Sequence, residues 1–471
     1  MDRNFFIRKY AQNILNKSAA VFIGAGVSIA SGYPDWENLV EPLAEELGLD
    51  MEKENDLLKV MQYYENTFGR NEISMRILNE FQKTERNNTN LEIITRLPID
   101  TYWTTNYDRE IEKYLEKNNR KIDVKITEKN LATNVYNRSA VLYKMHGDVT
   151  FPEDAVITKD DYDKYNSKKS LFKNALIGDL IGKTFLFIGF SFKDPNIDHV
   201  LSQIKLLIGN HKRKHYCIMK KVDSEANSYD AKRQEFFEKD LERYGIYTIY
   251  IDKYDEITNI LSDIEKKVLF NNIFISGSNA EEADELKLNK SWPDEKVRNF
   301  SYKLSNSLIK KNYKIISGFG LGIGSYVLNG SLDAIYTEKQ GDIDNNLILR
   351  PFPQLQDCED IKSKWTNYRN EIIKDAGVCI FIFGNKLDKQ NKNILIADGV
   401  KEEFKIAKEK EKIIIPIGST GWAAEEIWKE VHDNIKEYSY LENYIDLLKK
   451  ETNIDNLVTI IINILEEIKN K

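Results

Sequence analysis

The chain has 471 residues, of which 41% are hydrophobic and 30% are charged, a composition typical of soluble globular proteins. This length exceeds what one ordinary hydrophobic core holds, so we expect two domains. The net charge of -7 argues against wholesale nucleic-acid binding, which usually leaves a basic footprint.

Cysteine usage and hydropathy argue against several further classes of protein. The cysteines, Cys217, Cys358 and Cys379, lie far apart and form no C-x-x-C pair, so neither a disulfide framework nor a cysteine-based zinc site is expected. The N-terminus lacks the apolar core of a signal peptide, and no apolar run is long enough to span a bilayer. We therefore expect a cytoplasmic protein with reduced thiols, no metal and no membrane contact.

The first predicted strand runs directly into a glycine turn. Apolar spacing predicts a helix over 3–17 and then a strand over 19–24. The turn contains Gly24, Ala25, Gly26 and Ser28. Glycines at the C-terminal end of a buried parallel strand let backbone N–H groups approach a phosphate. Because Ile29 stands where the dehydrogenase fingerprint needs a third glycine, we expect a dinucleotide site but not hydride transfer.

Three further apolar strands end in small or polar residues. Helices are predicted over most of 36–95, followed by strands over 100–105, 140–145 and 184–188. The residues at their ends are Asn106 and Asp108, then His146, then Gly189, Ser191 and Asp194. The carboxyl ends of parallel strands lie along one edge of a sheet, so these ends are expected to line one pocket.

Asn106 and His146 are the candidate catalytic residues. Cleavage of the bond between ribose and nicotinamide in NAD has an oxocarbenium-like transition state, as in other glycosyl transfers. An amide side chain holds a water or a ribose hydroxyl by donating and accepting at once, and a histidine accepts a proton near neutral pH. Singly, Asn106 is more typical of a turn or a helix cap, and His146 is more typical of a structural histidine. Their joint order along the chain favours the catalytic interpretation.

A second α/β unit begins near residue 269, so the predicted domains cover 1–268 and 269–471. The strands of this second unit are expected over 273–275, 314–316, 346–349, 377–383 and 411–416. The first domain has two more expected strands, over 214–219 and 246–251. We expect a Rossmann-type parallel sheet with a helical insertion in the first domain and a Rossmann-like fold in the second. Each unit has its own glycine turns, which predicts two nucleotide sites.

The motif series of the first domain closely resembles that of the sirtuin family over roughly the first 270 residues. The matching segments are Gly24-Ala25-Gly26-Val27-Ser28, Gly32-Tyr33-Pro34-Asp35-Trp36, Thr105-Asn106-Tyr107-Asp108 and His146-Gly147. The resemblance implies that Asn106 and His146 are catalytic. It also implies that NAD contacts Gly24, Ala25, Gly26, Ser28, Asp35, Trp36, Asp108, Gly189, Ser191 and Asp194, with Asp35 and Trp36 near nicotinamide.

Two departures from that family bear on the substrate. Deacylating sirtuins carry a four-cysteine zinc module that helps form the cleft for the acylated peptide, and this chain has none. Glu37 follows Trp36, where the family usually has arginine. Hydrolysis of NAD by water is therefore favoured. A sirtuin-type protein deacylase and a non-catalytic nucleotide sensor stay open as alternatives.

Residues 270–471 resemble the SLOG family of nucleotide-sensing domains through Ser276-Gly277-Ser278 and Ser317-Gly318-Phe319-Gly320-Leu321-Gly322. A sirtuin-like domain joined to a SLOG domain resembles the effectors of bacterial Thoeris antiphage defence. That resemblance implies a homo-oligomer, a tetramer or larger, whose NADase is activated by a cyclic ADP-ribose isomer from a TIR-domain partner enzyme and depletes cellular NAD.

The phosphates of such a signal need backbone N–H groups and cations. The candidate signal-binding residues are Gly277, Ser278, Gly318, Gly320 and Gly322 for backbone contacts, Arg350, Arg369 and Lys386 for charge, and Glu403 for ribose hydroxyls.

Overall fold

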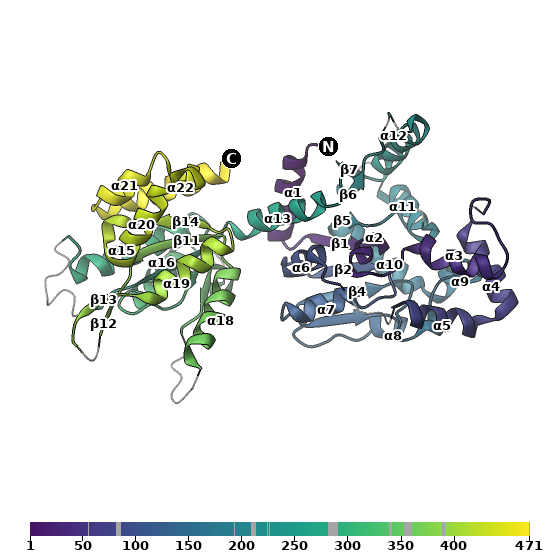
Figure 1. Ribbon diagram of the computed structural model, residues 1–471, viewed down its shortest axis with the longest axis horizontal. Coiled ribbons are helices and arrows are strands. Elements are labelled where there is room, and N and C mark those ends of the chain that lie inside the picture. The colour runs from purple at the N-terminus through teal and green to yellow at the C-terminus, as the bar shows by residue number, and fades with distance from the viewer. Residues whose placement is uncertain are drawn as a thin grey trace. The chain divides into compact units, whose positions relative to one another are not determined.

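The computed structural model of the chain divides into two compact units, Met1–Val268 and Leu269–Lys471 (Figure 1). It describes residues 1–54, 56–81, 86–192, 194–208, 213–223, 225, 227–280, 291–338, 342–352, 360–388 and 391–470. Among these residues, no helix has both the length and the apolar character that crossing a bilayer requires.

The first unit is built on one parallel sheet. Its strands are β1 (Ala19–Ile23), β2 (Thr101–Thr104), β3 (Ile122–Lys125), β4 (Ala140–Lys144), β5 (Thr184–Ile188), β6 (His215–Lys220) and β7 (Ile246–Ile251). They lie in the order β3-β4-β2-β1-β5-β6-β7, and every pairing is parallel. The four strands whose ends carry candidate residues, β4, β2, β1 and β5, are therefore consecutive neighbours, which confirms that their ends share one edge.

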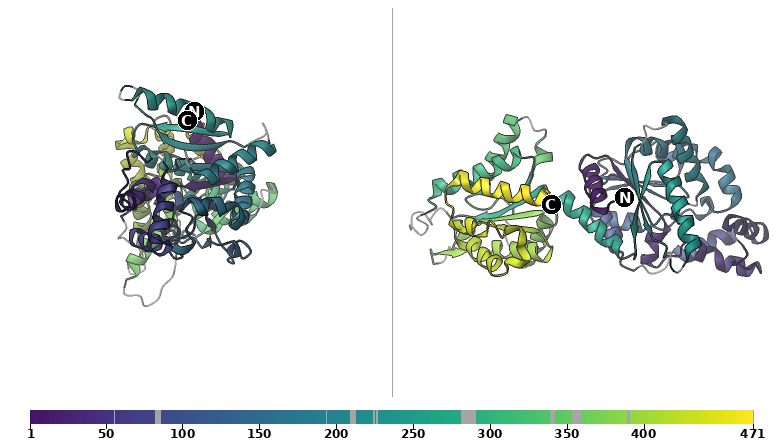
Figure 2. Two further views of the ribbon diagram at one scale, coloured as in Figure 1. Left: turned by 90° about the vertical axis from the view of Figure 1, so that its right-hand side faces the viewer. Right: turned by 90° about the horizontal axis from the view of Figure 1, so that it is seen from above.

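Both faces of this sheet are buried. Along β1, Val21 and Ile23 belong to one hydrophobic cluster while Ala20 and Phe22 belong to another, because successive side chains of a strand point to opposite faces. Helices cover each face (Figure 2). They are α1 (Arg3–Leu15), α2 (Ala25–Ser28), α6 (Thr89–Arg96), α7 (Glu110–Lys117), α8 (Glu128–Leu131), α9 (Lys159–Lys168), α10 (Ser170–Gly182), α11 (Pro195–Ile208), α12 (Ser228–Arg243) and α13 (Glu256–Leu269).

The predicted helical insertion lies between β1 and β2. It comprises α3 (Trp36–Glu46), α4 (Leu57–Phe68) and α5 (Arg70–Phe81), and its apolar stripe has a core of its own around Leu39, Leu43 and Met61. This insertion packs against Tyr107 and Val149, which follow β2 and β4. The insertion therefore lies beside the strand ends that carry Asn106 and His146.

The second unit has a smaller parallel sheet in the order β10-β9-β8-β11-β14. Its strands are β8 (Asn272–Ser278), β9 (Lys314–Ser317), β10 (Leu347–Leu349), β11 (Val378–Phe383) and β14 (Ile413–Pro416). Its helices are α15 (Asp294–Lys310), α16 (Gly324–Glu338), α17 (Ile343–Asn346), α18 (Ile361–Lys374), α19 (Asp398–Glu409), α20 (Trp422–Asp433), α21 (Ile445–Lys450) and α22 (Ile454–Asn470).

The sequence analysis missed three short strands: β3, and the antiparallel pair β12 (Asn385–Leu387) and β13 (Ile394–Ile396). The buried positions of β3 are Asp123 and Lys125, which form an ion pair of 2.9 Å. Ile122 and Val124 alternate with these charged residues and pack against the hydrophobic core, so β3 has the period of a strand although half of its residues are charged.

Candidate functional site

The glycine turn after β1 packs directly on the end of β5. Gly24 N donates to Ile188 O at 2.9 Å, and Gly26 N donates to Gly189 O at 3.0 Å. A Cβ atom at position 24 would collide with the backbone of Gly189, which itself has a φ of +62°. The glycines are therefore required for close packing of two predicted NAD-contacting segments, and these two N–H groups are used within the fold.

Ser28, Asn106 and Asp108 form one buried hydrogen-bonded group. Asn106 Nδ2 donates to Ser28 Oγ at 3.0 Å, and Ser28 Oγ donates to Asp108 Oδ2 at 2.8 Å. All three residues are less than a tenth exposed. The hydroxyl of Thr104 accepts from Asn106 N at 2.9 Å and donates to Ile23 O at 2.7 Å. Thr104 thus ties the backbone of Asn106 to the end of β1, and Ser28 accepts a hydrogen bond from its side-chain amide.

Lys144, the last residue of β4, is completely buried and was missed by the sequence analysis. Its Nζ donates to Asp108 O at 2.6 Å and lies 3.1 Å from Glu112 Oε1, and it also pairs with Asp148. Burial alone would lower the pKa of Lys144, but the carboxylates of Glu112 and Asp148 raise it above its usual value. Lys144 therefore stays charged and ties β4 to the loop that carries Asn106.

Replacing Lys144 with methionine is expected to lower the free energy of unfolding by about 3–5 kcal/mol, because it leaves two carboxylates buried without their cation. Urea unfolding followed by circular dichroism measures the change. The matched control is Lys164→Met, which breaks an exposed pair with Asp160 and should leave the midpoint unchanged. Equal midpoints for the two variants would contradict this account.

His146 follows β4 and is also buried. Its Nε2 lies 3.2 Å from Asp194 Oδ2 and its Nδ1 lies 3.4 Å from the Tyr162 hydroxyl. Burial lowers the pKa of His146, and Asp194 opposes this shift without cancelling it. The imidazole is therefore neutral at neutral pH, which is the form that accepts a proton.

Register places the two candidate catalytic residues side by side along the edge. Thr104 of β2 pairs with Lys144 of β4, and Asn106 and His146 each lie two residues beyond that pair. Asp194 follows β5, so its contact with His146 crosses the ends of β2 and β1, which lie between β4 and β5. The structure brings Ser28, Asn106 and Asp108 into one group, and His146 and Asp194 into one pair, at the edge where these strands end.

Three other predicted NAD contacts, Asp35, Trp36 and Ser191, are less buried than this group. Asp35 accepts from Asn38 N at 2.9 Å and so caps α3, whose first residue is the half-buried Trp36. Ser191 is exposed in the loop after β5.

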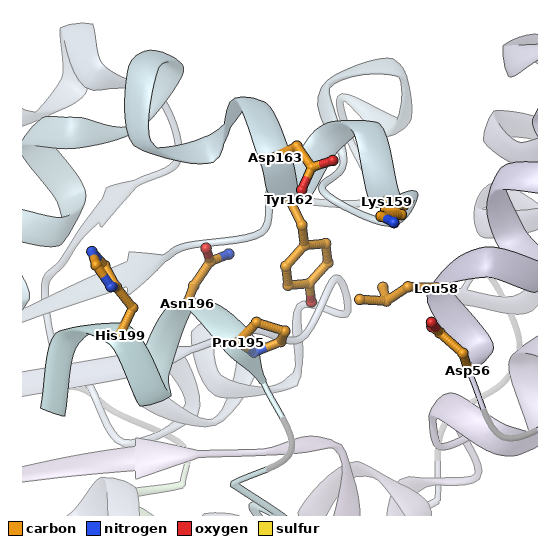
Figure 3. A pocket seen from close by; sticks show the side chains of 8 residues that line it. All are labelled: Asp56, Leu58, Lys159, Tyr162, Asp163, Pro195, Asn196 and His199. Atoms are coloured by element: carbon orange, nitrogen blue, oxygen red, sulfur yellow. The ribbon is translucent and has the colours of Figure 1, made fainter. Parts of the chain in front are cut away.

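A pocket of about 340 Å³ lies next to this site (Figure 3). It is lined by Asp56, Leu58, Lys159, Tyr162, Asp163, Pro195, Asn196 and His199. These residues come from the N-terminal cap and first two turns of α4, α9 and α11. Tyr162 belongs both to this pocket and to the surroundings of His146, and no sequence motif marks it.

In the second unit the glycine turns also pack against each other. A Cβ atom at Gly320 would collide with Gly277 O, and one at Gly322, whose φ is +71°, would collide with Asn279 O. Ser278 Oγ donates to Asn385 O at 2.6 Å. Gly318 is less crowded, because its nearest neighbour is the Phe352 ring. These turns stand at the carboxyl ends of β8 and β9.

Glu403 and Arg369 lie together beneath the end of β8. Ser276 Oγ donates to Glu403 Oε2 at 2.5 Å, and Arg369 Nε lies 3.5 Å from Glu403 Oε1. Arg369 also stacks on the ring of Phe352 at 4.8 Å and donates to Glu402 Oε2 at 2.7 Å. Burial raises the pKa of Glu403 to about 7, although Ser276 and Arg369 oppose the shift.

The two other candidate cations are more exposed. Lys386 pairs with Asp398 at 2.6 Å, and Arg350 lies 4.0 Å from Asp375. No group of three or more His, Cys, Asp or Glu side chains within the described ranges is arranged to hold a metal ion. Cys217 and Cys379 are buried free thiols, and Cys358 lies outside the described residues.

Comparison with known proteins assigns the chain to a family. A SIR2-like domain profile matches residues 100–249, and the profile of the Sir2- and TIR-associating SLOG family matches residues 256–468. NAD(+) hydrolase ThsA of Bacillus cereus (strain MSX-D12) is 43% identical over 99% of this chain and 98% of its own length. The chain belongs to the ThsA family. The member from Cytobacillus dafuensis, also named NAD(+) hydrolase ThsA, is 41% identical over 93% of this chain and 90% of its own length. The member from Enterococcus faecium has the same name and is 37% identical over 100% of both chains. The predicted sirtuin-like and SLOG folds are confirmed.

Proposed function

We propose that the chain hydrolyses NAD+ to nicotinamide and ADP-ribose at the edge where β4, β2, β1 and β5 end. The observation that carries this proposal is that Asn106 and His146 each lie two residues beyond the paired strand residues Thr104 and Lys144, and that both are buried with hydrogen-bond partners. The hydrolase names of the full-length relatives support it.

In the proposed reaction, Asn106 holds the attacking water or a ribose hydroxyl, and His146 takes the proton. The glycosidic bond breaks with its electron pair moving to the nicotinamide nitrogen, which loses its positive charge, while the water oxygen bonds to the ribose carbon. The water proton passes to neutral His146 and then to solvent. The proposed dinucleotide contacts are Gly24, Ala25, Gly26, Ser28, Asp35, Trp36, Asp108, Gly189, Ser191 and Asp194.

The second unit is proposed to bind the activating signal, a cyclic ADP-ribose isomer made by a TIR-domain partner enzyme. Arg369 and Glu403 are supported best, because both lie beside the glycine turns at the end of β8. In this proposal the chain acts in the cytoplasm as a homo-oligomer and depletes NAD+ in bacterial antiphage defence. A signal that raises the active population a hundredfold must favour the active arrangement by about 2.7 kcal/mol.

The test is nicotinamide release from NAD+ by the full chain, measured with and without each member of a panel of cyclic ADP-ribose isomers. One isomer is expected to accelerate release strongly, and an acyl-lysine peptide is expected to have no effect on NAD+ consumption. No release under any condition would reject the hydrolase. Equal rates with and without an isomer that calorimetry shows to bind would reject the regulation alone.

A further inference from the structure

Asn196 presents an unused hydrogen-bond donor at the wall of the pocket beside the candidate site. It is the second residue of α11 and is only 9% exposed. Its side-chain Nδ2 is buried and finds no hydrogen-bond acceptor among the described residues. Figure 3 shows this nitrogen on the side of Asn196 that faces Tyr162. Buried polar groups are nearly always paired, so an unpaired donor in a pocket wall indicates a ligand that supplies an oxygen acceptor.

The carboxylates and ammonium groups at this pocket balance each other. Asp56 pairs with Lys59 at 3.4 Å. Lys159 and Asp163 carry opposite charges, and neither forms an ion pair with another residue in the described ranges. All four side chains are exposed, so no buried charge requires a counter-ion. An uncharged ligand therefore fits this pocket better than an anion or a cation.

The pocket offers both apolar and polar surface to a ligand. Leu58, Pro195 and the ring of Tyr162 are apolar, whereas Asn196 and His199 carry polar side-chain nitrogens. The volume of about 340 Å³ is at the lower end of the range for small-molecule sites. A neutral polyol matches this chemistry, because its hydroxyls donate and accept hydrogen bonds and its C–H groups pack against apolar side chains.

Tyr162 connects this pocket to the proposed base. Its hydroxyl lies 3.4 Å from His146 Nδ1, and its side chain lines the pocket. When an oxygen displaces a leaving group directly from a sugar carbon, the base and the attacking oxygen lie on the face opposite the leaving group. The pocket therefore lies on the side from which an attacking hydroxyl approaches, and nicotinamide leaves on the other side.

We propose that this pocket is an acceptor site, where a neutral polyol takes the ADP-ribosyl group in place of water. One polyol hydroxyl replaces the Tyr162 hydroxyl beside His146 Nδ1, while another accepts from Asn196 Nδ2. The bond between ribose and nicotinamide breaks with its electron pair moving to the nicotinamide nitrogen. The polyol oxygen bonds to the ribose carbon, and its proton passes to His146 and then to solvent. This inference rests on the proposed NAD+ hydrolysis, which uses water in the same step.

The test is NAD+ turnover by the full chain in the presence of glycerol, with the isomer that gives the highest turnover. Mass spectrometry quantifies ADP-ribose and ADP-ribosyl-glycerol, and the readout is the ratio of the second product to the first. A general disturbance of the fold lowers both products together. We expect the ratio to exceed the molar ratio of glycerol to water, because a bound acceptor is already positioned to react. Glycerol 3-phosphate at equal concentration should give a lower ratio, because its phosphate meets no net positive charge there.

The decisive variant is Asn196→Ala. It removes the unpaired donor, and the backbone N–H that donates to Asp194 at 2.9 Å remains, so α11 is expected to keep its cap. We expect the product ratio to fall by about 2–10-fold, the contribution of one hydrogen bond between uncharged groups. The matched control is Asn174→Ala, at an exposed asparagine of α10, which should leave the ratio as it is.

The possible outcomes separate this inference from the proposed function. No nicotinamide release under any condition would overturn both. Nicotinamide release in glycerol with ADP-ribose as the sole sugar product would overturn the acceptor site and leave the hydrolase standing. Transfer that stays at or below the molar ratio of glycerol to water, or that is the same in Asn196→Ala and Asn174→Ala, would show that glycerol reacts without being bound in this pocket. Equal ratios for glycerol and glycerol 3-phosphate would overturn the assignment of an uncharged acceptor.

Discussion

Replacing either Asn106 or His146 with alanine is expected to lower nicotinamide release from NAD+ by at least about a hundredfold. A positioned general base contributes about 10²–10⁴-fold, and a positioned side-chain hydrogen bond at the reacting group contributes about 10²–10³-fold. Both side chains are buried at the shared edge, so solvent does not replace them easily. Chromatographic detection of nicotinamide at saturating NAD+ and activator measures the loss.

The two variants must remain folded for that result to count. Asn106→Ala removes one hydrogen bond to Ser28, which still donates to Asp108, so a cost of about 1 kcal/mol is expected. His432→Ala, at an exposed histidine of the second unit, is the control for the substitution itself. Undiminished turnover in both site variants, with unchanged thermal unfolding, would reject the hydrolase.

The sheet edge could be predicted from the sequence because its signal is local. Each of β1, β2, β4 and β5 lies in a largely apolar segment that leads into glycine or polar residues, and parallel pairing aligns such ends whatever the chain does between them. Asn106 and His146 could therefore be placed together from their positions just beyond two strands.

The individual contacts at this edge could not be predicted, although Ser28, Asp108 and Asp194 were expected there, because the contacts come from long-range packing. Asp194 lies 48 positions after His146, and its reach across two strand ends follows from the strand order rather than from any motif. In the sequence, Lys144 is an ordinary polar residue at the end of a strand. In the structure it is a buried cation, because Glu112 of α7 and Asp108 and Asp148 of two loops surround its Nζ. The sequence predicted that the glycine turn binds phosphate. The structure adds that close packing against Gly189 also requires glycine there.

The second large effect of a substitution is expected in the second unit, at the proposed signal-binding site. Arg369→Gln should raise the concentration of cyclic ADP-ribose isomer needed for half-maximal activation by about 10–100-fold, since a hydrogen bond to a charged group contributes about 1.5–3 kcal/mol. Its planar guanidinium is held between Phe352 and two carboxylates, an arrangement that glutamine does not reproduce. Titration of NAD+ turnover with the isomer measures the change.

The same site makes activation sensitive to pH. Glu403 has a raised pKa of about 7, so its carboxylate gains a proton as the pH falls through that value and compensates less of the charge on Arg369. An anionic signal should therefore bind the unsubstituted chain more tightly at about pH 6 than at about pH 8, and Glu403→Gln should remove most of that difference.

Lys408→Gln, which breaks an exposed pair with Glu430 elsewhere in this unit, is the control for Arg369→Gln. If Arg369→Gln and Lys408→Gln activate at the same isomer concentration as the unsubstituted chain, the phosphates of the signal do not contact Arg369.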